Sequence, residues 1–258
     1  MKPSVRTLLA ASALILVTAL YLVVLTAENS RRRDLSCQGV RVHITDSARL
    51  SFVSEKDIVS YMEEYGPYVG KRVEEVDLQA VENILSLKSA ILSGEAYMDR
   101  DGYINIDIVQ REPAIRFQKG DYGFYADEKG FIFPLQESYT SRVPIIDGAI
   151  PLDAAGGYKG KPATEEQKLW LLRINALIAY MKETEWLERI SQITVLRSGD
   201  LEMIPAQGRE KFIFGAPTDI EAKFQRIRTY YEAIAPAKEE GYYGRVDVRF
   251  DKQIICKK

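Results

Sequence analysis

The hydrophobic and polar pattern begins with a long apolar stretch, residues 8–27, that contains no charged side chain. A helix of this length rises about 1.5 Å per residue and spans roughly 30 Å, the thickness of the hydrocarbon core of a bilayer. Its Ser and Thr hydroxyls can hydrogen-bond back to their own helix, so they do not interrupt it. The stretch predicts a single transmembrane helix in contact with the lipid bilayer, with residues 1–7 as a short cytoplasmic tail and residues 28–36 as a charged linker.

A cleaved signal peptide is the alternative interpretation of this stretch. Signal peptides usually have a shorter apolar core, of about 7–15 residues, followed by small residues at the cleavage site. Here Leu25 stands where a small residue is needed. Basic residues occur on both sides of the stretch, so their distribution does not fix its orientation. Because the preceding tail is so short, we expect a retained helix with the bulk of the chain outside the cytoplasm.

Beyond the linker, residues 37–112 carry the pattern of a small α/β unit. Residues 40–44 and 103–108 alternate between apolar and polar side chains, as half-buried strands do. Ser54 and Asp77 each precede an amphipathic run and are placed to cap a helix. The resulting order is β-α-α-β-β, in which two helices can pack on one face of a sheet.

The chain after Glu112, residues 113–258, is rich in short strands and contains two predicted helices. Thr164 predicts the start of the first helix, and Thr218 the start of the second, each as part of a capping box. We expect the first helix to bury the stripe Leu169, Leu172, Ala176 and Ala179. Strands are expected at residues 122–126, 131–133, 143–148, 190–196, 201–204, 211–214, 245–250 and 253–256. These patterns together predict an α+β fold.

Composition and motifs favour no enzyme class. Apolar residues make up 46% of the chain, which is ample for packed cores. The net charge of −2 gives no reason to expect binding of nucleic acid, which requires a basic face. The single histidine, His43, falls in the polar phase of a strand, and no glycine-rich phosphate loop is present. Cys37 and Cys256 lie far apart in the sequence, and unpaired thiols are favoured over a disulfide between them. We therefore expect no catalytic residue, no metal site and no cofactor.

Two further kinds of cluster have simple interpretations. Neighbouring acidic residues do not share a helix face, so pairs such as 63–64, 74–75 and 239–240 are interpreted as solvated charges. Tyrosines gather with glycines in residues 65–68 and 241–244. We interpret these two tyrosine clusters as loop packing, and a ligand-binding platform is the alternative.

The end of the chain carries a different signal. Phe250 closes an alternating strand, and a short turn leads to the apolar run Ile254, Ile255 and Cys256. A last strand after a hairpin is often a sheet edge, and an edge exposes backbone groups that can pair with another chain. The alternative is an internal strand, or an edge that the two terminal lysines protect.

Four segments resemble motifs of the bacterial cell-division family FtsQ (DivIB), in the order in which that family has them. Residues 104–114 resemble the strand that leads into its R-x-P junction, and residues 125–133 resemble its D-x-x-G-x-x-F hairpin. Residues 143–148 resemble its L-P-x-x-x-G stretch, and residues 246–250 its V-D-L-R-Y strand. Each motif is short, but the four lie in order from residue 104 to residue 250 behind an apolar helix, and the architecture that resembles the family covers nearly the whole chain.

The resemblance implies a POTRA domain over residues 37–112 and the β domain of the family over residues 113–258. It implies a non-enzymatic scaffold in the inner membrane at the division septum, which helps control septal peptidoglycan synthesis. The implied partners are the membrane proteins FtsB and FtsL, with FtsK, FtsW and FtsI as further candidates. By position, the partner-binding residues are Phe250, Gln253, Ile254, Ile255 and Cys256.

Two details qualify the resemblance. The last hairpin of the family often contains a glycine, which residues 251–253 lack. The first half of the soluble chain, residues 37–93, matches the family in pattern more than in residues. The charged residues Arg245, Asp247 and Arg249 are expected on the opposite phase of their strand, available for ion pairs at the rim of an interface. Two other classes remain open: a membrane-anchored hydrolase of the cell wall, which would need converging carboxylates, and a POTRA-type export or assembly factor, which would need a membrane barrel.

Overall fold

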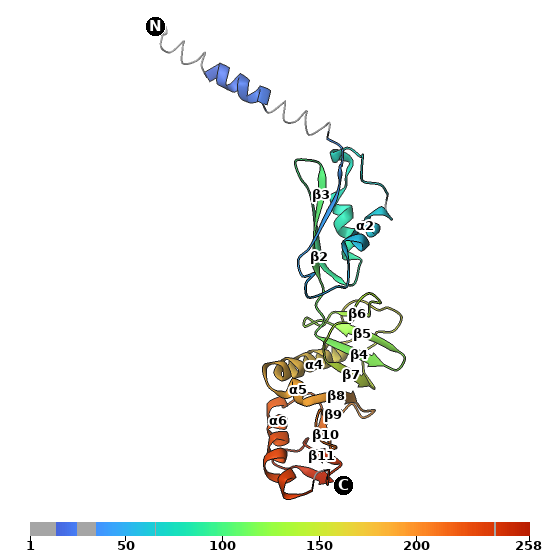
Figure 1. The fold of residues 1–258 in the computed structure, drawn as a ribbon, viewed down its shortest axis with the longest axis vertical. Coiled ribbons are helices and arrows are strands. Elements are labelled where there is room, and N and C mark those ends of the chain that lie inside the picture. Colours follow the sequence, from blue (N-terminus) through green and yellow to red (C-terminus); the bar gives the residue numbers. More distant parts are fainter. Residues whose placement is uncertain (1–13, 25–34, 65, 240) are drawn as a thin grey trace. The chain divides into compact units, whose positions relative to one another are not determined.

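The computed structural model describes residues 14–24, 35–64, 66–239 and 241–258 (Figure 1). The chain divides into two compact units. The first comprises the residues up to Arg49 together with Val53–Gln110, and the second comprises Leu50–Phe52 together with Arg111–Lys258.

Residues 14–24 are helical, in the middle of the apolar stretch. The hydroxyl of Thr18 donates to the carbonyl oxygens of Leu14, at 3.0 Å, and Ile15, at 2.9 Å, as expected for a polar residue in an apolar helix. The rest of the expected span 8–27, the tail 1–7 and most of the linker 28–36 lie outside the described residues. Within the described ranges, no helix combines the length and the apolar character that crossing a bilayer requires.

The first unit has the predicted order of elements. It contains β1 (Gly39–Ile44), α2 (Glu55–Glu63), η1 (Val73–Glu75), α3 (Leu78–Ser86), β2 (Ile91–Met98) and β3 (Tyr103–Gln110). The sheet order is β1-β3-β2, with β3 parallel to β1 and antiparallel to β2. Alternate residues of β3 are buried, and α2 and α3 bury their apolar residues with them.

Both predicted caps are present in this unit. Ser54 accepts a hydrogen bond from the backbone N–H of Asp57, whose carboxylate accepts one from the N–H of Ser54, which completes a capping box. Asp77 accepts from the N–H of Ala80 at the start of α3. These bonds satisfy backbone donors that the first turn of a helix leaves unpaired.

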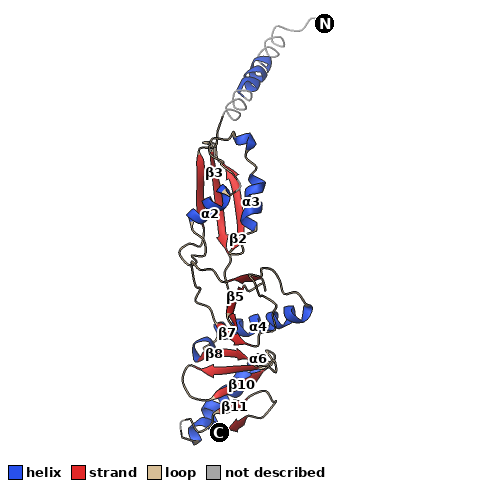
Figure 2. Cartoon of the chain, turned by 90° about the vertical axis from the view of Figure 1, so that its right-hand side faces the viewer, coloured by secondary structure: helices blue, strands red, loops and turns tan. Residues whose placement is uncertain are grey.

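The second unit is built on one sheet with helices along one side. Its elements are β4 (Ile115–Lys119), β5 (Tyr122–Ala126), β6 (Ile132–Pro134), β7 (Ile145–Gly148), α4 (Glu165–Glu183), α5 (Trp186–Arg189), β8 (Ile190–Val195), β9 (Leu201–Pro205), β10 (Lys211–Gly215), α6 (Ile220–Thr229), η2 (Tyr230–Ile234), η3 (Ala235–Ala237), β11 (Arg245–Asp247) and β12 (Ile255–Lys257). The nine strands follow the order β12-β11-β10-β9-β8-β7-β4-β5-β6. Figure 2 shows these strands one after another, from β5 to β11.

Parallel pairs are formed wherever a longer connection intervenes. Strands β4 and β7, β7 and β8, and β10 and β11 pair in parallel, while the remaining neighbours are antiparallel. Helix α4 lies in the connection from β7 to β8, and α6 lies in the connection from β10 to β11. A parallel pair needs such a crossover, because a tight turn can join only antiparallel strands.

The core of the second unit lies between this sheet and its helices. Trp186 stacks on Phe224 of α6 with ring centroids 4.8 Å apart, and Phe214 of β10 contacts the same ring at 5.2 Å. Helix α4 contributes Leu171, Ile174, Leu177, Ile178 and Met181. The predicted stripe of α4 was wrong: Leu169 and Leu172 are exposed. Helix α4 has apolar residues on more than one face. The face that packs on the sheet is the one with Leu171, Ile174 and Ile178, and not the predicted one.

Other expectations need correction as well. The strand predicted over residues 245–250 is shorter, since β11 ends at Asp247. Thr164 does accept from the N–H of Gln167, so the first cap holds. The second capping box is absent, because the N-cap of α6 is Asp219, whose φ of 52° is left-handed and whose side chain makes no cap bond. The backbone conformation, and not side-chain capping, sets the start of this helix.

Candidate functional site

Strand β12 forms one end of the nine-stranded sheet. It pairs on one side with β11, with Val246 opposite Cys256 and Asp247 opposite Ile255. On its other side, no strand of the described chain is paired with it. Backbone groups on such a side are available to another chain.

The opposite edge of the same sheet is covered. Ile132 of β6 forms a backbone bridge with Gly160, with N–H to oxygen distances of 2.7 and 2.9 Å in the two directions. A loop therefore protects β6, while β12 has no such bridge in the described residues. This difference marks β12 as the accessible edge of the sheet.

The five sequence-predicted site residues lie on both sides of the last turn. Ile255 and Cys256 belong to β12, and Gln253 and Ile254 immediately precede it. The side chains of Ile254 and Cys256 pack against the core, while Gln253 is exposed. Phe250 stands before the turn and is 41% exposed, which is high for so large an apolar side chain. The structure thus brings an apolar surface residue next to the open strand.

In the last turn, a lysine occupies the backbone conformation that glycine usually adopts. Lys252 has a φ of 55°, in the left-handed region that favours glycine. It follows Asp251 in the turn before Gln253. The hairpin therefore closes without glycine, at some cost in backbone strain.

Arg226 of α6 holds this hairpin, a role that sequence reasoning missed. Its Nε donates to the carbonyl oxygen of Val248 at 2.8 Å, before the turn. Its Nη1 lies 3.8 Å from a carboxylate oxygen of Asp251, within the turn. No sequence signal links these residues, because α6 and the hairpin meet only through the fold.

Two of the three expected rim charges, Asp247 and Arg249, pair with each other, while Arg245 is exposed as expected. Asp247 is almost fully buried, and Arg249 contacts both its carboxylate oxygens, with the closest nitrogen to oxygen distance 2.7 Å. Arg249 also contacts Asp200 at 2.9 Å. Burial raises the pKa of Asp247, but the hydrogen bonds and charge of Arg249 outweigh it, so the pKa is below its usual value. The pair leaves Asp247 buried, while Arg249 itself stays at the surface.

The side chain of Arg249 also packs directly over a glycine, Gly215 of β10. A Cβ on Gly215 would lie 2.7 Å from Cγ of Arg249, so only a residue without a side chain fits beneath the arginine. The alternating pattern predicted exposed side chains at these positions. The arginine side chain therefore lies over Gly215 while its guanidinium pairs with Asp247.

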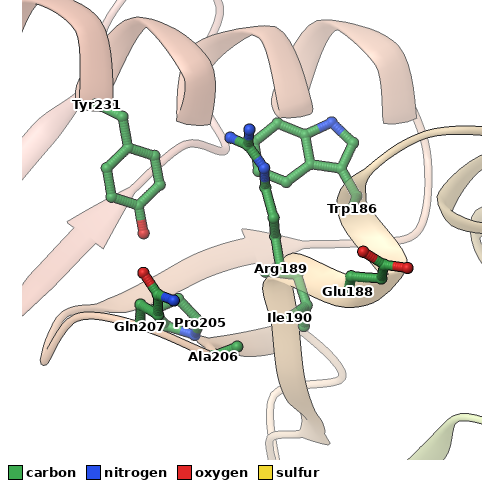
Figure 3. Close-up of a pocket in the computed structure, with 8 residues that line it drawn as sticks. All are labelled: Trp186, Glu188, Arg189, Ile190, Pro205, Ala206, Gln207 and Tyr231. Atoms are coloured by element: carbon green, nitrogen blue, oxygen red, sulfur yellow. The ribbon is translucent and has the colours of Figure 1, made fainter.

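Two adjoining pockets lie beside the loop that connects β9 with β10. The larger, of about 470 Å³, is lined by Trp186 and Arg189 on one side and Tyr231 on the other, as Figure 3 shows. The smaller, of about 210 Å³, shares Gln207 and Tyr231 with it. The predicted tyrosine cluster at residues 241–244 contributes to the smaller pocket.

The remaining candidate chemistry is placed as follows. His43 of β1 is exposed, as its strand phase predicted. Cys37 is buried and Cys256 half-buried, and both are free thiols. Across the described residues, no cluster of three or more His, Cys, Asp or Glu side chains is arranged to hold a metal ion.

Comparisons with known proteins assign both halves of the chain. A family profile described as FtsQ/DivIB, C-terminal related, matches residues 112–257. A profile described as a POTRA-like domain matches residues 35–109. No curated protein matches the chain. The resemblance drawn from the sequence motifs is thereby confirmed at the level of the family.

Proposed function

The chain belongs to the FtsQ/DivIB, C-terminal related, family, and from this premise we propose that it is a non-enzymatic scaffold of the bacterial division machinery. In this role it links early and late division proteins and helps control septal peptidoglycan synthesis. Residues 37–112 form its POTRA domain, and residues 113–258 form its β domain.

The observation that carries this proposal is the open edge at β12. A partner segment in extended conformation adds a strand there, so that backbone hydrogen bonds supply most of the attraction. Side chains then confer specificity, with Phe250 as an exposed apolar anchor beside the strand. The inner side chains, Ile254 and Cys256, are half-buried and pack against the core, which holds the edge strand on the sheet.

The proposed partners are FtsB and FtsL, with FtsK, FtsW and FtsI as further candidates. Residues 8–27 cross the cytoplasmic membrane once and carry the rest of the chain to the outer side. Their lack of charge and their length support this placement. A single membrane anchor brings the β domain near membrane-anchored partners and raises their effective concentration.

The experiment is co-purification of the full chain with FtsB and FtsL of the same organism. Two variants disrupt the edge: a chain that ends at Phe250, and Ile254→Pro, which removes a backbone donor next to β12. Leu172→Ala, at an exposed apolar position of α4, is the matched control. We expect the unaltered chain and the control to bind, and both edge variants to lose binding while remaining folded by circular dichroism.

Two outcomes would count against the proposal in different ways. Binding that survives both edge variants would move the partner site away from β12. Failure of the unaltered chain to bind any division protein would contradict the scaffold function itself.

A further inference from the structure

The smaller pocket is walled by tyrosines and contains a buried carboxylate. Tyr230 and Tyr231 come from η2, and Tyr242 and Tyr243 come from the loop before β11. Glu210, which immediately precedes β10, completes the wall. We call this group the tyrosine pocket.

The rings of the tyrosine pocket stand at steep angles to one another. Tyr230 and Tyr231 meet at 67° with centroids 5.3 Å apart, and Tyr242 and Tyr243 meet at 90° at 4.9 Å. Tyr230 and Tyr243 close the box at 6.5 Å and 64°. Phe212 of β10 supports both η2 rings from the core, at 5.6 and 5.7 Å. The arrangement resembles an aromatic cage, in which ring faces surround a small volume.

Glu210 is a buried carboxylate that is held by hydrogen bonds. Its side chain is only 6% exposed, and its carboxylate accepts from the N–H of Arg209 at 3.0 Å and from the hydroxyl of Tyr231. No lysine or arginine in the described parts of the chain forms an ion pair with it. A buried carboxylate without a cation is costly, and a cation that entered the pocket would remove that cost.

The phenol groups of Tyr230 and Tyr231 carry no charge that competes with this carboxylate. Burial raises the pKa of Tyr230 to about 12, and burial together with the hydrogen bond to Glu210 raises the pKa of Tyr231. Both rings therefore stay neutral at physiological pH. Neutral ring faces attract cations and do not attract anions.

The structure itself shows that one of these rings attracts ammonium groups. The Nζ atoms of Lys238 and Lys258 lie 5.2 and 4.4 Å from the ring centroid of Tyr242, at the rim. Neither lysine forms an ion pair with Glu210 in the described structure. Lys238 also lines the pocket, whose volume of about 210 Å³ lies among Glu210 and the tyrosine rings.

From this geometry we propose that the tyrosine pocket binds the lysine or arginine side chain of a protein partner. Pockets for drug-sized ligands have volumes of about 300–1,000 Å³, so a pocket of about 210 Å³ fits a single long side chain better than a small-molecule ligand. The carboxylate of Glu210 pairs with the cation, and the rings of Tyr230, Tyr231 and Tyr243 enclose its stem.

The position of the pocket connects it with the edge strand. Lys258, the residue after β12, contacts Tyr242 through its ammonium group, so one end of β12 lies beside the pocket. A segment paired with β12 would pass this point and could place a basic side chain in the pocket. This link rests on the proposed function, whereas the pocket's preference for a cation does not.

The test is an NMR titration of the full chain, with tyrosine ring carbons labelled, using Nα-acetyl-lysine-N-methylamide as the probe. The matched probe is the norleucine amide, which has the same aliphatic chain without the ammonium group. We expect saturable shifts of the Tyr230, Tyr231 and Tyr243 rings, with lysine bound at least about tenfold more tightly than norleucine. Equal binding of the two probes, or shifts that never saturate, would overturn the proposal.

A pair of variants locates the charge that recognises the probe. Glu210→Gln keeps the shape and a hydrogen-bond acceptor, and we expect it to lose at least about tenfold in lysine affinity. Glu221→Gln, at an exposed position of α6, should bind as the unaltered chain does. Unchanged affinity of Glu210→Gln would overturn the assignment. If Glu210→Gln does not fold, the comparison of lysine with norleucine on the unaltered chain decides. Neither probe can add a strand to β12, so failure here leaves the edge proposal standing.

Discussion

The guanidinium of Arg111 lies 2.7 Å from the carboxylate of Asp127, 16 residues further along the chain. Both side chains are about nine-tenths buried, and the guanidinium also lies 3.8 Å from the ring centroid of Phe131. This ion pair joins the R-x-P junction to the D-x-x-G-x-x-F hairpin, two motifs that the sequence presents as separate.

The first prediction concerns this ion pair. Arg111→Ala leaves the carboxylate of Asp127 buried without a cation, and we expect a loss of about 3 kcal/mol in the free energy of unfolding. The control is Arg41→Ala, which breaks the exposed pair with Asp99 and a contact with the ring of Tyr103, and should cost much less. Urea unfolding of the three chains measures both values. Equal losses in the two variants would contradict the account of Asp127.

The second prediction concerns pH. Because the pKa of Asp247 is lowered below 3.8 in the folded chain, its contribution to stability is present above that value and is lost as the pH falls further. We expect Asp247→Asn to be less stable than the unaltered chain at pH 7. Unfolding at a series of pH values should show this difference shrinking below pH 3.8. A difference that grows on acidification would have the wrong sign.

The third prediction concerns the strained turn. Glycine adopts a φ of 55° without steric cost, so Lys252→Gly relieves strain at the last turn. We expect a net gain of about 0.5–1 kcal/mol in the free energy of unfolding. This net value already includes the opposing effect of glycine's greater freedom in the unfolded chain. Lys257→Gly, within β12, should instead destabilise the chain. The sign for Lys252→Gly decides whether this lysine is strained.

The fourth prediction concerns Arg226. Arg226→Gln loses the contacts that hold Val248 and Asp251, and we expect a loss of about 1–2 kcal/mol. Amide hydrogen exchange in β12 should become faster, because the hairpin is no longer fixed to α6. Arg228→Gln, which affects a half-exposed pair with Glu185, is the control. Unchanged exchange in Arg226→Gln would show that α6 does not hold the edge.

Local pattern predicted the elements better than their arrangement. The alternation in β3 and the caps at Ser54 and Thr164 depend on neighbouring residues, and all three are found in the structure. The stripe on α4 failed because two overlapping apolar faces compete, and only the sheet decides between them. The strand order of the sheet pairs β4 with β7, although β5 and β6 lie between them in the sequence, and no local signal encodes that pairing.

The candidate site shows the same division. The pattern identified Ile255 and Cys256 as a terminal strand, because an apolar run after a turn is visible in the sequence. It misjudged Asp247, since alternation predicts which way a side chain leaves the strand but not whether another side chain covers it. Arg226 and Glu210 come from distant parts of the chain, so only the folded structure reveals their roles.

The most direct test of the central claim is hydrogen exchange at the edge strand with and without bound FtsB and FtsL. We predict that amides in residues 253–257 exchange at least about tenfold more slowly in the complex, because a partner strand occupies the open side of β12. Amides of β6, whose edge Gly160 already bridges, should not change. A stable complex in which residues 253–257 exchange at the same rate as in the free chain would contradict the claim.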